Sequence, residues 1–171
     1  MIKRIFKTKD KSIRFHKDDE NLMQMIYQII AAYFEDDCAD ELALDPVFNA
    51  ILEKDSLASQ PTLSRFFNRM DEDTLLQFDA IDKSLRNIIY AIKRPEHMLL
   101  DLDSTLFGTY GHQEGEGFNF HYQAHGYHPL LCYDGLSGDL LKAELRDGTL
   151  HCSNNGDKFM PPLSGVHGKR Y

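Results

Sequence analysis

The chain has 171 residues, a length that suits one domain or a small domain with a further segment. Hydrophobic residues make up 42%, enough for a packed core, which excludes a wholly disordered chain. The net charge of −8 at pH 7 argues against a generic nucleic-acid binder. The longest apolar stretch is broken by Gln28, and the basic N-terminus lacks the apolar centre of a signal peptide. We therefore expect a cytoplasmic protein with no membrane partner.

Cysteine and histidine spacing indicates neither a disulfide framework nor a zinc site. The three cysteines are odd in number, far apart and without a CxxC motif, so reduced thiols are expected. Several histidines gather in a Gly- and aromatic-rich segment without helical periodicity, which disfavours zinc ligation. These histidines are His112, His121, His125 and His128.

The charge is distributed unevenly along the N-terminal half. Residues 1–17 hold seven Lys/Arg and one acid, whereas residues 18–55 hold eleven Asp/Glu and only Lys54 as a base. A basic arm of this kind can contact phosphates or can be a solvated leader, and the sequence leaves both interpretations open.

The first part of the chain has helical patterns. Asp18, Asp19 and Glu20 stand where acids favour a helix start, and the apolar segment NLMQMIYQIIAAYF follows. A short helix is predicted from Pro46 to Leu52, with Asp45 as its cap.

The segment SLASQPTLSRFFNRM predicts another helix, capped by Ser59 and with Pro61 in its first turn. A short helix, a break and then a polar helix is typical of a helix-turn-helix, whose second helix enters a major groove. An ordinary amphipathic helix in a bundle is the alternative, and the pattern alone favours it. We expect Leu63, Phe66 and Phe67 to face inward. The outward residues are Gln60, Thr62, Ser64, Arg65, Asn68 and Arg69.

A long helix should begin at the cap Asp71 and end before Pro95, which cannot continue a helix. Apolar residues recur along it at helical spacing and form one stripe. These residues are Leu75, Phe78, Ile81, Leu85, Ile88, Ile89 and Ile92.

From residue 97 the pattern changes from helices to strands. Residues 97–105 predict a strand, and residues 128–146 predict a hairpin that turns at residues 134–138. The segment between them is glycine-rich and predicts a loop, or a loop that runs into a strand at 118–122. Helices followed by strands indicate an α+β fold.

Two aspartates end the first predicted strand, in HMLLDLDSTLFGTYG. Asp101 and Asp103 share one face, since alternate strand residues point to opposite faces. Carboxylates at a strand end can hold Mg²⁺, which prefers oxygen ligands. A pair of solvated carboxylates at a turn is the alternative.

The segment LLDLDSTL resembles the DxDxT motif of haloacid-dehalogenase-type phosphatases. That resemblance implies that Asp101 is the nucleophile and Asp103 the general acid/base. The motif is short and gives false positives readily. A glycine loop and a hairpin follow it, where that family has crossover helices, and this disfavours the phosphatase interpretation.

A longer resemblance covers roughly residues 20–160. The ordered blocks ADELALDPVFNAI, ASQPTLSRFFNRM, LLDLDST, GTYGHQEG and HGYHPLLCYDGLSGDLLKAELRDGTLHCSNN resemble cut-and-paste insertion-sequence DDE transposases. It implies a helix-turn-helix-like DNA-binding region at 1–95 and a partial ribonuclease H-like catalytic domain at 96–171. It also implies transposon-end DNA as partner, homo-oligomers or mixed multimers with intact transposase, and a bacterial, nucleoid-associated location.

The resemblance assigns site residues as well. Asp103 matches the family's first catalytic Asp and a ligand of Mg²⁺ or Mn²⁺, and Asp101 is a second, weaker metal-ligand candidate. Glu114 fits the family pattern but is expected to be an exposed loop residue. Arg146 could contact a phosphate, although a surface arginine is expected. The DNA-contacting candidates are Gln60, Thr62, Ser64 and Arg65.

The family chemistry needs three carboxylates that hold two metal ions. We find no later strand with a second Asp and no helix with a Glu, because Asp157 is the only acid in residues 156–171. We therefore expect a truncated, inactive copy of a transposase. A regulator that only binds DNA and inhibits an intact transposase is the alternative of a non-enzyme class.

Overall fold

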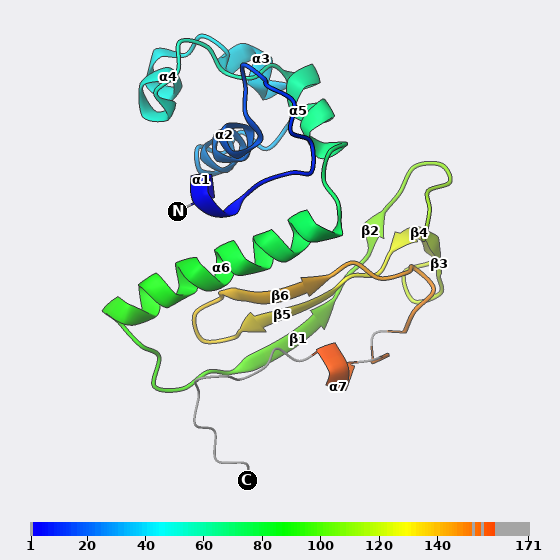
Figure 1. Cartoon of the computed structure of the whole chain (residues 1–171). Helices are drawn as coiled ribbons and strands as arrows, with labels where there is room; N and C mark the ends of the chain where they lie inside the picture. Colours follow the sequence, from blue (N-terminus) through cyan, green and yellow to red (C-terminus); the bar gives the residue numbers. More distant parts are fainter. Residues whose placement is uncertain (1, 152, 155, 160–171) are drawn as a thin grey trace. The chain divides into compact units, whose positions relative to one another are not determined.

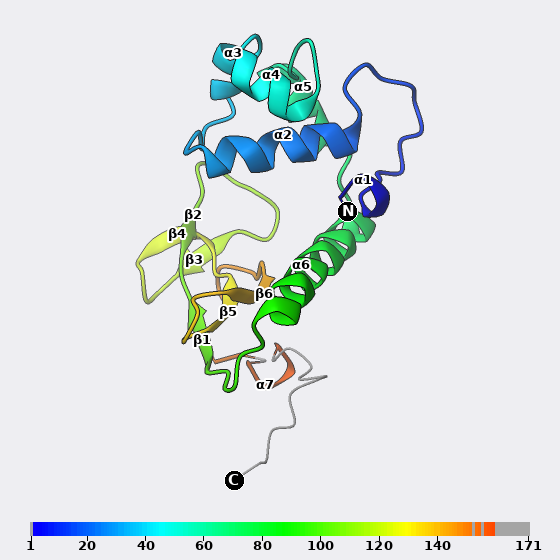
Figure 2. The same cartoon turned by 90° about the vertical axis from the view of Figure 1, so that its left-hand side faces the viewer.

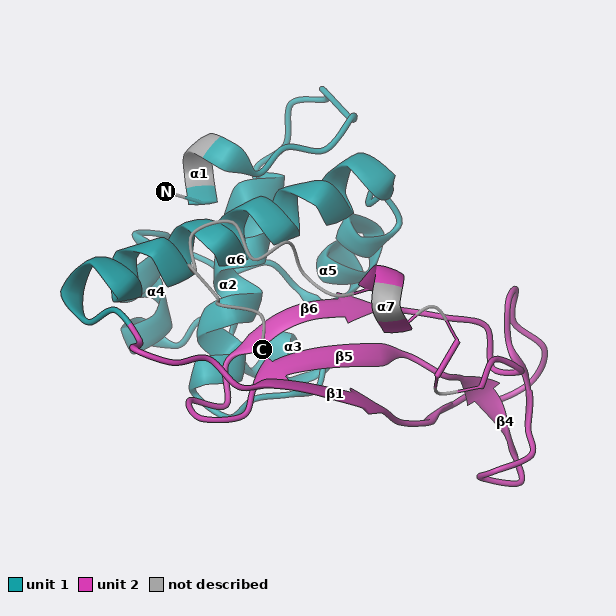
Figure 3. Cartoon of the chain, turned by 90° about the horizontal axis from the view of Figure 1, so that it is seen from below, with its two compact units in different colours: residues 1–94 teal, residues 95–171 magenta. Residues whose placement is uncertain are grey.

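The computed structural model describes residues 2–151, 153–154 and 156–159. The chain divides into two compact units, residues 1–94 and 95–171, which are coloured separately in Figure 3. Each unit is described by itself.

The first unit is helical (Figure 1). Figure 2 shows α3, α4 and α5 grouped along one side of α2, in agreement with the contacts of α2 with α4 and α5. The helices are α1 (Ile2–Ile5), α2 (Asp18–Ile30), α3 (Cys38–Leu42), α4 (Pro46–Leu52), α5 (Gln60–Phe67) and α6 (Glu72–Ile92).

Local capping explains where these helices begin. The Asp45 carboxylate accepts hydrogen bonds from the first free N–H groups of α4, and Pro46 occupies the first turn. Asp71 and Thr74 form a reciprocal capping box on α6. Both helix starts confirm the predictions from the sequence. Ser59 is the residue before α5, but its hydroxyl caps no backbone N–H.

The core of this unit joins the basic N-terminal segment to the helices. Phe6 is 1% exposed, and its ring lies 5.9 Å from that of Phe66 and 5.3 Å from that of Phe78. Leu22 and Ile81 complete the buried cluster. Residues 1–17 are therefore not simply a solvated leader, because Phe6 anchors them in the core.

Two predictions about buried faces need correction. Phe67 is 41% exposed, because it lies about 100° around α5 from its buried neighbour Phe66. Phe78 and Ile81 of the predicted apolar stripe on α6 pack into the core of this unit. The other members are exposed, and they are Leu75, Leu85, Ile88, Ile89 and Ile92.

The second unit holds two small antiparallel sheets, with strand orders β1–β5–β6 and β2–β4–β3. With the helices of the first unit, the chain is α+β, as predicted. The β5–β6 hairpin confirms the predicted one. The elements are β1 (Leu100–Ser104), β2 (Phe107–Gly108), β3 (Gly117–Asn119), β4 (Ala124–Tyr127), β5 (Leu130–Asp134), β6 (Leu140–Glu144) and α7 (Gly156–Phe159).

The glycine-rich segment departs from the prediction. The strand expected at 118–122 ends at Asn119, and a turn through Gln123, whose φ is +52°, leads into β4. The Asn119 side chain holds this turn, because its Oδ1 accepts the N–H groups of His121 and Tyr122.

A small core lies on one face of the β1–β5–β6 sheet. Leu130 and Cys132 of β5 pack with Phe159 of α7, and Leu100 and Leu141 border them. Cys38 and Cys132 are free thiols. Within the described residues, no helix is long and apolar enough to cross a membrane.

Candidate carboxylate site and nucleic-acid interface

The aspartate pair lies on the exposed face of β1. In the antiparallel register Asp101 lies opposite Tyr133 and Asp103 opposite Leu131 of β5. Both aspartates are exposed, whereas Leu100 on the other face packs against the buried cluster. The Asp103 carboxylate accepts a 2.8 Å hydrogen bond from the N–H of Ser104. Strand alternation thus directs both carboxylates to solvent on the same side, as predicted.

Two carboxylates so placed have the oxygen donors that Mg²⁺ prefers. Among the residues that the structure describes, however, no group of three or more His, Cys, Asp or Glu side chains gathers to hold a metal ion. The two carboxylates suit Mg²⁺ or Mn²⁺ in the kind of donor that they offer.

Asp134 fixes the strand that carries this pair. Its carboxylate is 2% exposed and accepts hydrogen bonds from Leu99 N, Leu136 N and Ser137 Oγ, each at 3.1 Å. Burial raises the pKa of Asp134, but these hydrogen bonds together lower it below its ordinary value of 3.8. On the same strand β5, burial and the Asp101 charge raise the pKa of the Cys132 thiol.

The four DNA-contact candidates on α5 fall on two faces. Thr62 and Arg65 lie on one face, three residues apart, whereas Gln60 and Ser64 lie together on another. Asp40 accepts a 2.9 Å hydrogen bond from the N–H of Gln60, so a carboxylate stands beside this second face. Thr62 Oγ1 lies 3.2 Å from Ser59 Oγ. Only the face of Thr62 and Arg65 therefore offers a basic surface.

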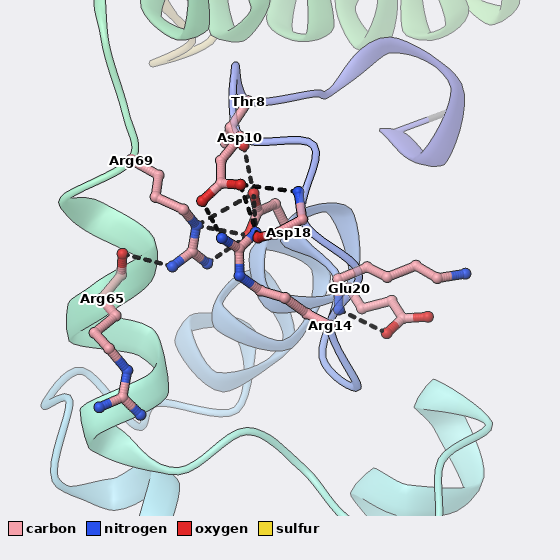
Figure 4. A network of polar contacts seen from close by, with 9 residues as sticks. Thr8, Asp10, Arg14, Asp18, Glu20, Arg65 and Arg69 are labelled. Carbon is pink, nitrogen blue, oxygen red and sulfur yellow. Dashed lines mark hydrogen bonds and ion pairs between the residues drawn. The ribbon is translucent and has the colours of Figure 1, made fainter.

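A polar network links the N-terminal arm to this face (Figure 4). The Asp18 carboxylate, 9% exposed, accepts hydrogen bonds from Arg69 Nη2 at 2.5 Å and Nε at 3.1 Å. It also accepts one from Thr8 Oγ1 at 2.5 Å and lies 3.9 Å from Arg14 Nη1. Arg14 forms an ion pair with Asp10. The expectation that Arg69 points outward is wrong, because Asp18 draws its guanidinium inward.

An open cleft of about 520 Å³ lies beside this network. Sequence reasoning missed Arg14, Asp18 and Arg69 as members of one site. In the sequence, Asp18 is recognisable only as an acid at a helix start. Its partner Arg69 is 51 residues away, so no local pattern indicates their contact. The lining residues are Asp10, Arg14, Phe15, His16, Thr62, Arg65 and Arg69.

The family model described as transposase DDE domain group 1 matches residues 1–170. The chain belongs to the DDE transposase family. No curated protein and no solved structure matches it. Family membership favours the transposase interpretation of LLDLDSTL over the phosphatase one.

Two further residues of this family member have structural roles. Arg146 is buried, not a surface arginine: its Nε donates to His128 O at 3.1 Å and its Nη1 to Asn154 O at 2.9 Å. A phosphate contact by Arg146 is therefore disfavoured. Glu116, before β3, accepts hydrogen bonds from His125 at 2.9 Å and His112 at 3.3 Å. The pKa of Glu116 is lowered, and the hydrogen bond from His125 is the largest cause.

Proposed function

We propose that this chain takes part in DNA transposition, with residues 1–95 binding DNA and residues 96–171 forming part of a ribonuclease H-like catalytic domain. The family match over residues 1–170 carries this proposal. The geometry of the second unit supports it. An exposed Asp lies on the first strand of an antiparallel sheet, and a hairpin supplies the next two strands, in the order β1–β5–β6.

Asp103 is the first catalytic carboxylate in this proposal, and both Asp103 and Asp101 are metal ligands. A bound Mg²⁺ or Mn²⁺ would activate the attacking oxygen and stabilise the leaving oxygen during strand cleavage and transfer. The chain's own contribution is a pair of carboxylates on one exposed strand face. The hydrogen bond from Ser104 N fixes one Asp103 oxygen and leaves the other open to a cation.

The DNA-binding part uses α5. Gln60, Thr62, Ser64 and Arg65 are the proposed contacts with transposon ends, and the exposed Arg65 supports this assignment most directly. Binding through phosphates weakens as salt rises, so a flat salt response would count against it. We propose a nucleoid-associated location in a bacterial cell, and homo-oligomers or mixed multimers with intact transposase.

Strand cleavage by these 171 residues alone is not expected, because no third carboxylate joins Asp101 and Asp103 within the described part of the chain. The same observation favours a role as a DNA-binding regulator that occupies ends and inhibits an intact transposase. In this second role the chain is not an enzyme.

The test uses purified chain, transposon-end duplex and a scrambled duplex of equal length, with Mg²⁺ or Mn²⁺. We expect preferential binding to the ends and no nicking. Metal-dependent nicking that disappears in Asp103→Asn would overturn the non-cleaving role and establish an active enzyme. Equal affinity for both duplexes would show that the chain does not recognise transposon ends, and would therefore rule out the regulator role.

A further inference from the structure

We propose that residues 8–17 and α5 together form a cleft that binds phosphates of the DNA backbone, and that Asp18 is the positioning residue that orders its basic side chains. This inference rests on the proposed DNA-binding function and deepens it. It adds residues 8–17 to α5 as a segment that contacts DNA, and it gives the acidic residue Asp18 a role in DNA binding.

The cleft is basic in an acidic surrounding. Three arginines line it, against Asp10 in the lining and Asp18 beside it, a net formal charge of +1 with His16 neutral. Residues 18–55 of the same unit hold eleven acids and one base. A polyanion is therefore attracted to this part of the unit and repelled from most of the rest.

Asp18 connects the two walls of the cleft. It binds Arg69 from the turn after α5, Thr8 from the N-terminal segment and, at longer range, Arg14. Arg69 also donates from Nη1 to the carbonyl of Arg65 at 2.7 Å. The N–H donors of Arg69 are thus used inside the protein, and its charge is held at the wall of the cleft. Binding of a ligand is therefore assigned to Arg65 and Arg14.

Arg65 and Arg14 are those neighbours. The Arg65 guanidinium is exposed and, among the described residues, makes no hydrogen bond or ion pair. Arg14 pairs with Asp10 on the arm and keeps further N–H donors. The two walls can therefore both donate to a phosphate, Arg65 with two parallel N–H donors and Arg14 with the donors that Asp10 leaves free.

The shape of the cleft favours a backbone over a free small anion. It is open and about 520 Å³ in volume, larger than one phosphate group requires. Phe15 is 75% exposed at its edge, where an aromatic ring can pack on a sugar or an unpaired base. A chain of phosphates and sugars would occupy this space, whereas a lone phosphate would leave most of it to water.

The experiment measures affinity for a short fluorescent duplex of arbitrary sequence by anisotropy over a range of salt. We expect Arg14→Ala and Arg65→Ala each to weaken binding about tenfold at low salt, the effect of one hydrogen bond to a charged group. Each should reduce the salt slope by about one. Lys83→Ala, which removes an exposed charge on α6, is the matched control and should bind as the wild type does.

The sharper test is Asp18→Asn. Removing a negative charge near DNA should by simple attraction tighten binding, yet we expect about threefold weaker binding because Arg69 and Arg14 lose their anchor. Asp19→Asn makes the same charge change at the adjacent residue, which does not line the cleft, and should not weaken binding. Circular dichroism checks that the variants are folded.

The outcomes separate this inference from the proposed function. If the wild type binds DNA but the Arg14 and Arg65 variants bind equally well, the cleft is wrong and DNA binding stands. If Asp18→Asn binds more tightly, the positioning role is wrong. Competition by inorganic phosphate at concentrations matched to the duplex phosphates would identify a small-anion site and overturn the assignment. No DNA binding by the wild type would overturn both proposals.

Discussion

The carboxylate of Asp134 and the backbone of Leu99 are joined across 35 residues of chain. Leu99 N donates to Asp134 Oδ1 at 3.1 Å, and Leu99 O accepts from the next residue, Gly135, at 2.7 Å. This pair of bonds fixes the start of β1 against the end of β5. The register that directs Asp101 and Asp103 to one exposed face is therefore anchored outside the aspartate pair.

Asp134→Ala should destabilise the second unit by about 3 kcal/mol, because three donors lose a buried carboxylate acceptor. Urea denaturation monitored by tyrosine fluorescence measures the change. Asp139→Ala in the same hairpin turn is the control, since the turn uses the backbone carbonyl of Asp139, not its side chain. Equal stability of the two variants would contradict the anchoring role of Asp134.

Gln24 has a comparable role in the first unit. Its side-chain amide donates to Ala58 O at 2.9 Å and accepts from Ala58 N at 2.8 Å, and Ala58 is 0% exposed. Gln24→Ala should cost about 3 kcal/mol, because both backbone groups lose their partners in the interior. Gln28→Ala is the matched control: Gln28 is also buried, but its Nε2 has no hydrogen-bond partner among the described residues. A thermal melt that ranks Gln28→Ala as the more damaging change would refute this account.

Gly126 permits the close approach of β4 to β2. A Cβ at this position would lie 2.3 Å from Phe107 O, a backbone atom that cannot move without breaking the pairing. Gly126→Ala should therefore destabilise the unit by about 2 kcal/mol. Gly108→Ala, on the paired strand, places its Cβ in open space and should be tolerated. The melting temperatures of the two variants test this prediction. Equal values would show that the close approach at Gly126 does not require glycine.

The Glu116 carboxylate predicts a pH dependence. Its lowered pKa means that its contribution to stability is present above the ordinary value of 4.5 and is lost as the pH falls through the lower folded-state value. Glu116→Gln should therefore be less stable than the wild type near neutral pH, and the difference should shrink in acid. Denaturation midpoints across this pH range test it, with the exposed Glu114→Gln as control. A difference that grows in acid would contradict the assigned sign.

Local signals in the sequence were sufficient for much of the fold. Caps such as Asp45 and Asp71 fix where α4 and α6 begin, because they act on backbone groups within the next three residues. An apolar run predicted β1, and the alternate pointing of strand residues placed Asp101 and Asp103 on one face. The family resemblance that assigns Asp103 a role in transposition likewise comes from residues that can be compared in order along the chain.

Only the tertiary structure decided which distant groups meet. Asp18 and Arg69 are 51 residues apart, and Gln24 and Ala58 are 34 apart. Arg146, expected at the surface, is buried by its bonds to His128 O and Asn154 O. No local preference encodes such partners, because a buried charge or amide takes whichever group the packed elements bring within hydrogen-bonding distance.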